Sequence, residues 1–291
     1  MRTIDEIMTS LGKQINAKAK QSVPPPAQIA TKTVALPQWP EEVRACPSCV
    51  LRSALFGIVE RGRRKLLERA VVATWEGVTI RYTGGQLDQA DLDVWLALLH
   101  IAREHNLGVR VPVTVGEILK TMGRPTGGSA REWFKCAIAR LTACAVEITA
   151  GGKTFGGPLI EGFVRDEVTG EHVLYLSPRL VVLFEDDAFT WIDWEHRRSL
   201  SRDLAKWLHS YILSHKAARD RPHRIGLARL RELCGSEREE LRFFRRDVRE
   251  AMTELQAAGV VVTWRITPGD ALEVVRPNRK RHLIEGERST S

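Results

Sequence analysis

Residues 236–259, SEREELRFFRRDVREAMTELQAAG, are the stretch that decides the fold of this chain. Glu239 follows Ser236 by three positions, which is the spacing of a capping box at the start of a helix. Apolar residues then recur every three or four positions as far as Gly259, which is typical of one buried stripe on a helix. The stripe consists of Leu241, Phe244, Val248, Ala251, Met252 and Leu255. The spacing predicts a helix of about six turns over 236–259.

The opposite side of this predicted helix is cationic. Its arginines, close enough in space to form one strip, are Arg242, Arg245, Arg246 and Arg249. On an isolated helix, such a strip is as often a solvated face as a binding surface. The rest of the sequence has to decide between the two interpretations.

The composition favours a folded protein with an anionic partner. The chain has 291 residues, of which 43% are hydrophobic and 27% charged, enough for two domains with proper cores. A net charge of +8 and a pI near 9.5 indicate that the partner is anionic. No run of about 18 apolar residues occurs, so we expect no membrane contact. Five cysteines are an odd number for a disulfide framework, which favours the reducing cytoplasm.

The middle of the chain predicts a winged-helix module, a variant of the helix-turn-helix fold. Apolar spacing and turn residues indicate a helix at 89–105, a strand at 109–113, a short helix at 115–122 and a longer helix at 129–142. Three strands follow, at 145–149, 159–165 and 173–176. The longer helix starts with Ser129 and Glu132, which repeat the capping-box spacing. This order of helices followed by a β-hairpin is that of a winged helix.

The second half of the chain repeats this order. Trp95 lies 28 residues before Gly123, and Trp207 lies 28 residues before Gly235. Beyond the turns at Gly123 and Gly235, we align Ile138, Leu141, Val146 and Thr149 of the first half with Met252, Leu255, Val260 and Thr263 of the second half. The segments 260–267 and 272–276, joined by a turn with Pro268 and Gly269, then supply a second wing.

We therefore predict an α+β protein with two tandem winged-helix domains, at 51–190 and 191–276. A flexible N-terminal segment, 1–50, precedes them, because five prolines between positions 21 and 40 favour an extended linker. A basic disordered tail, 277–291, ends the chain.

In this arrangement 236–259 is the recognition helix of the second domain, and its four arginines are the main candidates for contacts in the DNA major groove. The weaker candidates are Arg131, Lys135 and Arg140 on the corresponding helix of the first domain, Lys153 at its wing tip, Arg265 on the second wing, and Arg197 and Arg198 between the domains. Arg197 and Arg198 could equally pair with acidic neighbours. The sequence does not sort these cations between base and phosphate contacts.

No catalytic, metal or cofactor site is expected. Gly152-Lys153-Thr154 resembles the end of a phosphate-binding loop, but Glu147 stands where that loop requires glycine. Cys46 and Cys49 form a lone CxxC pair, and no second ligand pair follows at a suitable spacing. We therefore predict a binding protein and not an enzyme.

Several segments resemble the plasmid replication initiator proteins of the IncP type, the TrfA family. The residues on which the resemblance rests are Arg52-Ser53-Ala54-Leu55-Phe56, Ile80-Arg81-Tyr82-Thr83-Gly84 with Leu87, Val94 and Trp95, Val181-Val182-Leu183-Phe184 with Thr190, Trp194 and Glu195, and Leu233-Cys234-Gly235-Ser236. They are spread over about residues 40–276 and do not depend on one motif.

The resemblance implies two winged-helix domains that bind repeated origin sites (iterons) on double-stranded plasmid DNA. It also implies opening of an AT-rich segment, recruitment of host helicase and initiator proteins, and a dimer of two copies that must separate before replication starts. Members of the family contain a Gln-Leu-x-Leu-Phe peptide that docks on the sliding clamp. Here the matching stretch, 33–37 before Trp39-Pro40, lacks the glutamine and the phenylalanine, so the resemblance does not extend to clamp binding.

The sequence thus predicts a cytoplasmic, sequence-specific DNA-binding protein that initiates plasmid replication. The alternative is a winged-helix transcriptional regulator without replication activity, because a fold shared by both does not separate them. Direct repeats in the neighbouring DNA would favour the initiator, and a single palindrome the regulator.

Overall fold

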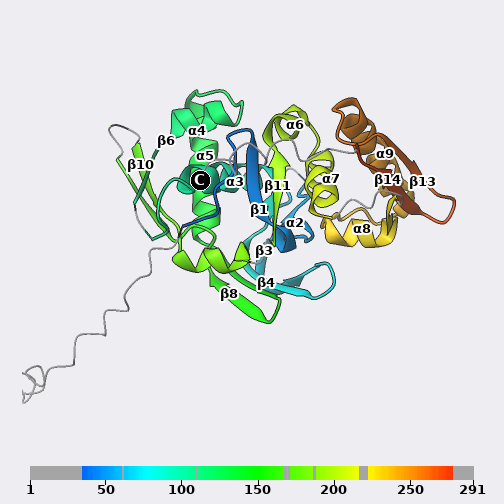
Figure 1. The fold of residues 1–291 in the computed structure, drawn as a ribbon, viewed down its shortest axis with the longest axis horizontal. Coiled ribbons are helices and arrows are strands. Elements are labelled where there is room, and N and C mark those ends of the chain that lie inside the picture. Colours follow the sequence, from blue (N-terminus) through cyan, green and yellow to red (C-terminus); the bar gives the residue numbers. More distant parts are fainter. Residues whose placement is uncertain are drawn as a thin grey trace, which may run out of the picture. The chain divides into compact units, whose positions relative to one another are not determined.

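The computed structural model describes residues 35–60, 62–108, 110–166, 169, 171–185, 188–215 and 222–277, all within one compact unit, Ala35–Ser291. The predictions for residues 1–34, and for the basic tail apart from its first residue, Pro277, lie outside the described residues. Mixed helices and strands make up the described part, as an α+β protein requires (Figure 1).

The first described residues are part of the core. Strand β1 (Val43–Pro47) is buried along its whole length and pairs antiparallel with β11 (Phe189–Asp193). Leu36 and Trp39 are also buried, and the Trp39 Nε1 donates a hydrogen bond to His100 Nδ1 at 2.9 Å. The predicted flexible segment 1–50 is therefore wrong for residues 35–50. Its prolines are compatible with an extended chain, and the apolar side chains between them bury against the fold.

Two short connections follow β1. Helix α2 (Ser48–Leu51) contains the second cysteine of the CxxC pair, and β2 (Phe56–Gly57) pairs in parallel with β5 (Leu87–Asp88). Cys46 is buried and Cys49 is half-buried, and burial raises the pKa of both thiols. Among the described residues, no group of three or more His, Cys, Asp or Glu side chains could hold a metal ion.

The first half contains the predicted series of helices. Apart from the strands of a second sheet, its elements in chain order are α3 (Gln89–Ala102), β6 (Val111–Thr114), α4 (Val115–Thr121), α5 (Gly128–Thr142), β9 (Gly162–Arg165) and β10 (Glu171–Tyr175). Helix α3 starts with a capping box in which Asp88 and Asp91 satisfy each other's backbone N–H groups. The three strands form a sheet in the order β6-β10-β9.

A second sheet in this half has the order β3-β4-β7-β8. Its strands are β3 (Leu66–Val72), β4 (Val78–Gly85), β7 (Ala145–Ala150) and β8 (Lys153–Gly157). The predicted strands do not include 153–157, which forms β8, so that β7 pairs with β8 and β9 pairs with β10. Gly151 and Gly152 both have positive φ, so the chain reverses in a two-residue turn and returns at once.

The second half repeats the topology of the first. Its elements are α7 (Asp203–Ser214), β12 (His223–Gly226), α8 (Leu227–Leu233), α9 (Leu241–Ala257), β13 (Thr263–Ile266) and β14 (Ala271–Val275), with the sheet order β12-β14-β13. Gly123 and Gly235 end the two 28-residue spacings that begin at Trp95 and Trp207. Gly123 follows α4 by two residues, Gly235 follows α8 by two residues, and both have a φ of +67°. By its place in the sheet, β13 corresponds to β9. The alignment of Val146 and Thr149 with Val260 and Thr263 is therefore wrong, since the β7–β8 hairpin is an insertion.

Two short helical segments connect the halves. A 3-10 helix, η1 (Pro178–Leu183), precedes β11, and α6 (Trp194–Ser199) lies between β11 and α7. Strand β11 spans the predicted domain boundary at 190/191, and its partner is β1. In the part of the chain that the structure describes, no helix is both long and apolar enough to span a membrane.

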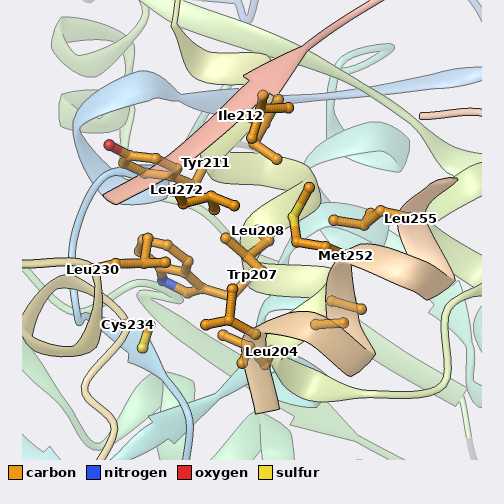
Figure 2. Close-up of a cluster of buried hydrophobic side chains, with 14 of the residues drawn as sticks. Leu204, Trp207, Leu208, Tyr211, Ile212, Leu230, Cys234, Met252, Leu255 and Leu272 are labelled. Carbon is orange, nitrogen blue, oxygen red and sulfur yellow. The ribbon is translucent and has the colours of Figure 1, made fainter. Parts of the chain in front are cut away.

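The core of the second half is built from α7, α8, α9 and the sheet. In Figure 2, Leu208 of α7 points toward Met252 of α9, and the rings of Trp207 and Tyr211 lie on its other side, near Leu230 and Leu272. The predicted stripe on α9 is confirmed at Phe244, Val248, Ala251, Met252 and Leu255, all of which are fully buried. Burial of side chains of this size stabilises a fold by about 1.5–3 kcal/mol each. The buried stripe therefore fixes the orientation of α9 about its own axis and determines which face of the helix is exposed.

Two histidines at the edge of this core predict a pH-dependent stability. His215 and His223 lie with their ring centroids 4.4 Å apart, and His223 Nε2 lies 3.2 Å from the Tyr211 hydroxyl. Burial, together with the neighbouring His223 and Arg52, lowers the pKa of His215 to about 3. Burial and the nearby Arg276 and Arg52 lower the pKa of His223 to about 4.

Because an unfolded histidine titrates at about 6.5, the unfolded chain binds more protons than the folded chain below that pH. We expect the free energy of unfolding to be highest above pH 6.5 and to fall as the pH drops toward 4. Urea denaturation at pH 7.5, 6.0 and 5.0 measures this slope. The variant His215→Phe/His223→Phe should flatten the slope, and an unchanged slope would assign it to other groups.

Candidate DNA interface

Helix α9 begins later than the sequence predicts. Its first residue is Leu241, and its N-cap Glu240 forms no side-chain capping bond. The Ser236 hydroxyl instead accepts from the backbone N–H of Arg238 at 3.4 Å. The guanidinium of Arg231 donates to the carbonyl oxygens of Arg238 and Glu239 at 3.0 and 2.7 Å, which holds this segment outside the helix. The capping box predicted at Ser236 is therefore wrong.

The capping box predicted at Ser129 is also wrong. Helix α5 starts at Gly128 with Gly127 as its N-cap, so Ser129 is already the second residue of the helix. At that position its own N–H is one of the first-turn donors and its side chain cannot cap the helix.

Three of the four arginines on α9 lie on its outward face. Arg242 and Arg246 have 72% and 60% of their side chains exposed, and Arg249 is exposed as well. Arg242 pairs with Glu240 at 2.7 Å and Arg246 with Asp247 at 3.6 Å, while no carboxylate among the described residues pairs with Arg249. Exposed pairs of this kind contribute about 0–1 kcal/mol. A phosphate could replace them at little cost.

Arg245 has a different position. Its side chain is 28% exposed, forms an ion pair with Asp270, and donates to the carbonyl oxygen of Thr267 at 3.3 Å. Both partners belong to the turn between β13 and β14, which lie beside α9 (Figure 1). Arg245 thus ties the helix to the hairpin, and we define the outward strip of α9 as Arg242, Arg246 and Arg249.

Phe243 is part of this surface, and the sequence analysis did not single it out. The residue is 40% exposed. The guanidinium carbons of Arg242 and Arg246 lie 4.8 and 5.8 Å from the centroid of its ring. Successive residues on a helix point about 100° apart, so Phe243 and its buried neighbour Phe244 could not both face the core. The two adjacent phenylalanines in the sequence were therefore the signal that one of them is exposed.

The helix α5 has a less basic outward side. Arg131 is exposed and donates to the Thr126 carbonyl oxygen at 3.2 Å, and Lys135 pairs with Glu132 at 2.7 Å. Arg140 is bound to the buried carboxylate of Asp91 at 2.6 Å. Arg140 therefore has a structural partner, contrary to the predicted DNA contact, and only Arg131 and Lys135 remain as candidates on α5.

The two wing-tip candidates both have acidic neighbours. Lys153, at the β7–β8 turn, forms an ion pair with Glu185. Arg265 on β13 is 75% exposed and pairs with Glu273 of β14 at 2.6 Å. Both pairs are exposed on at least one side, so each cation remains accessible to a phosphate.

Arg197 pairs with an acidic residue, whereas Arg198 remains available for a phosphate contact. Arg197 is fully buried and donates from Nε to Asp93 Oδ1 at 2.6 Å. Its other nitrogens donate to the Ser210 hydroxyl at 2.9 Å and to the Gln89 side-chain oxygen at 3.1 Å. Arg197 thus joins α3, α6 and α7, and it has no access to a phosphate. Arg198 is exposed and lies against Gly123 at the end of α4.

Comparison with known proteins places the chain in a family. The sequence model described as "TrfA protein" matches residues 11–271. The chain belongs to the TrfA family. A relative from Escherichia coli, the plasmid replication initiator protein TrfA, is 30% identical over 232 residues, which cover 77% of this chain and 59% of the relative. The chain therefore spans about three fifths of the length of that TrfA protein.

Solved structures share the fold at low sequence identity. Domains 2 and 3 of RctB superpose with a TM-score of 0.55 at 14% identity, covering 79% of this chain and 98% of that one. The Pi initiator protein in complex with iteron DNA gives a TM-score of 0.50 at 12% identity, covering 64% of this chain and 92% of that one. These likenesses show a common fold for this TrfA-family chain.

Two of the segments that resemble the TrfA family meet in space. The N–H of Ile58 donates to the carbonyl oxygen of Cys234 at 2.8 Å. A Cβ atom on Gly57 would lie 3.2 Å from the carbonyl oxygens of Ala54 and Cys234, so a larger residue would strain this contact. The Trp207 indole N–H also donates to the Ser53 carbonyl oxygen at 3.1 Å. The segment 52–58 is thus packed against the start of the loop that leads into α9.

Proposed function

We propose that this chain is a plasmid replication initiator that binds repeated origin sites on double-stranded plasmid DNA through α9. The observation on which the proposal rests is the outward strip Arg242, Arg246 and Arg249, on a helix whose opposite face is locked into the core. Membership of the TrfA family, the name of the E. coli relative and the fold shared with an initiator bound to iteron DNA support it.

The proposal includes two winged-helix domains. The first consists of α3, β6, α4, α5 and the β9–β10 hairpin, and the second of α7, β12, α8, α9 and the β13–β14 hairpin. In such a fold the third helix enters the major groove and the hairpin contacts the backbone beside it. Arg265 on β13, and Arg245 where α9 contacts the β13–β14 turn, would then lie on the phosphate side of α9.

The same proposal extends to the partners expected of an initiator. These are the host helicase and initiator proteins, and a second copy of the chain in an inactive dimer. It assigns no catalytic step to the protein. It places the protein in the cytoplasm. Clamp binding is not part of it, because Leu36, in the stretch that matches the clamp-binding peptide, is buried.

Two measurements test the proposal. First, the purified full chain should bind the direct repeats found beside its gene at least about a thousandfold more tightly than a scrambled duplex, which is the lower end for specific DNA binding. Fluorescence anisotropy at a fixed salt concentration measures this ratio. Second, a plasmid that contains the gene and its flanking repeats should replicate in a host without another initiator for that origin.

The controls separate initiation from regulation. A plasmid with the repeats deleted should not replicate, and one with a frameshifted gene should replicate only when the protein is supplied from elsewhere. Tight binding to the repeats without replication would identify a transcriptional regulator. Equal binding to the repeats and to the scrambled duplex would contradict both functions.

A further inference from the structure

Phe243 lies in the first turn of α9. It is the third residue of the helix, and in helix-turn-helix folds the N-terminal residues of the recognition helix contact the base edges. Its ring is 40% exposed between two guanidinium groups, although the neighbouring Phe244 is fully buried. An exposed aromatic side chain at this position has no role in the core of the protein.

The two flanking cations restrict what the ring could contact. An apolar protein surface that covered Phe243 would also remove water from Arg242, Arg246 and their surface ion pairs, and taking charged groups out of water is costly even when they are paired. A DNA groove avoids this cost, because phosphates line its rim while the base edges form its floor. The arrangement therefore fits an apolar group on a base, with an anion on either side.

We propose that Phe243 contacts the C5-methyl group of a thymine in the repeated site and so determines specificity at that position. This inference rests on the proposed function. Among the four bases, only thymine presents a methyl group in the major groove, and phenylalanine is one of the side chains that contact it. The guanidinium carbons of Arg242 and Arg246 lie 4.8 and 5.8 Å from the ring centroid, within the range of cation–π attraction, which keeps the ring beside them.

Replacing thymine with deoxyuridine removes only that methyl group and leaves base pairing intact. Each thymine of one repeat is replaced in turn, and the dissociation constant is measured by anisotropy for the full-length wild type and for Phe243→Ala. For the wild type, we expect one or two positions at which uracil weakens binding roughly fourfold, the factor for one buried methyl group. Phe243→Ala should bind the unmodified repeat roughly tenfold more weakly and should be insensitive to uracil at the same positions.

Matched variants control for folding and for apolar surface in general. Phe243→Leu should retain part of the sensitivity to uracil, because it keeps an apolar side chain. Val71→Ser changes another exposed apolar residue, on β3 and outside both proposed winged-helix domains, and should leave both the affinity and the sensitivity unchanged. Circular dichroism should be the same for all four proteins.

Three outcomes would overturn the inference. Phe243→Ala could bind with wild-type affinity, it could keep the full sensitivity to uracil, or the wild type could lack that sensitivity at every position. In each of these the wild type still distinguishes the repeat from a scrambled duplex, so the proposed function survives. Loss of that distinction in the wild type is a different result, because it removes the proposed function itself.

Discussion

The variant Arg242→Ala/Arg246→Ala/Arg249→Ala should bind the repeated origin site at least about a hundredfold more weakly than the wild type. An arginine that contacts a base contributes about 1–3 kcal/mol to discrimination, so three such losses exceed the 2.8 kcal/mol that corresponds to a factor of about one hundred. The fold should be unaffected, because all three side chains are exposed and their ion pairs are on the surface. Anisotropy titrations and thermal unfolding measure the two effects.

The salt dependence of binding assigns the roles of the three arginines. Each lost phosphate contact should reduce the slope of log K against log salt by about one, whereas a lost guanine contact should relax specificity at one base pair. Arg63→Ala/Arg110→Ala/Arg179→Ala is the matched control, since it removes the same charge at exposed positions outside α9. If the control loses as much affinity as the α9 variant, total charge and not the outward strip governs binding. If the α9 variant binds like the wild type, another surface contacts the site.

Arg245 is left out of this variant for a structural reason. The sequence alone would include it in the strip, but its guanidinium is already paired with Asp270 and with the Thr267 carbonyl. Its removal would disturb the β13–β14 turn as well as the charge, and a loss of binding would then have two causes.

Arg197→Ala should destabilise the protein by about 3–5 kcal/mol. The variant leaves the buried carboxylate of Asp93 with only Lys206, which is 2.7 Å away, and removes the donors to the Gln89 side-chain oxygen and the Ser210 hydroxyl. Breaking a buried ion pair by deleting one member costs about this much, because the remaining charge stays buried. The midpoint of urea denaturation, with the slope compared between variants, measures the loss.

The neighbouring residue supplies the control. Arg198→Ala removes the same charge from an exposed position and should change the free energy of unfolding by no more than about 0.5 kcal/mol. Arg197→Lys should fall between the two, because lysine keeps the charge but cannot reach all the oxygens that the planar guanidinium contacts. If Arg197→Ala lowers the free energy of unfolding by less than about 1 kcal/mol, water or Lys206 compensates the buried negative charge of Asp93.

The features that the sequence predicted correctly depend on residues close together in the chain. The buried stripe on α9 follows from apolar residues three and four positions apart, and the turns after α4 and α8 from Gly123 and Gly235. Exposure of the basic side follows from the same periodicity, because a helix that buries one face must expose the other. These predictions needed no knowledge of distant contacts.

The predicted capping boxes at Ser236 and Ser129 failed although they are local patterns. The spacing of serine and glutamate is necessary for a capping box, but the chain around it must also turn at that residue. Before α9, Arg231 binds the carbonyl oxygens of Arg238 and Glu239 and delays the start of the helix. The start thus depended on a side chain from α8, which no pattern within the helix contains.

Long-range packing decided which cations are available for binding. Arg197 and Arg140 look like surface residues in the sequence, but their carboxylate partners lie 104 and 49 positions away, at Asp93 and Asp91. The burial of Leu36 likewise required the assembled fold. Local spacing could therefore place a helix and its two faces. The choice of partner for each charge came from tertiary structure, because a buried ion pair is stable only where folding brings both groups out of water together.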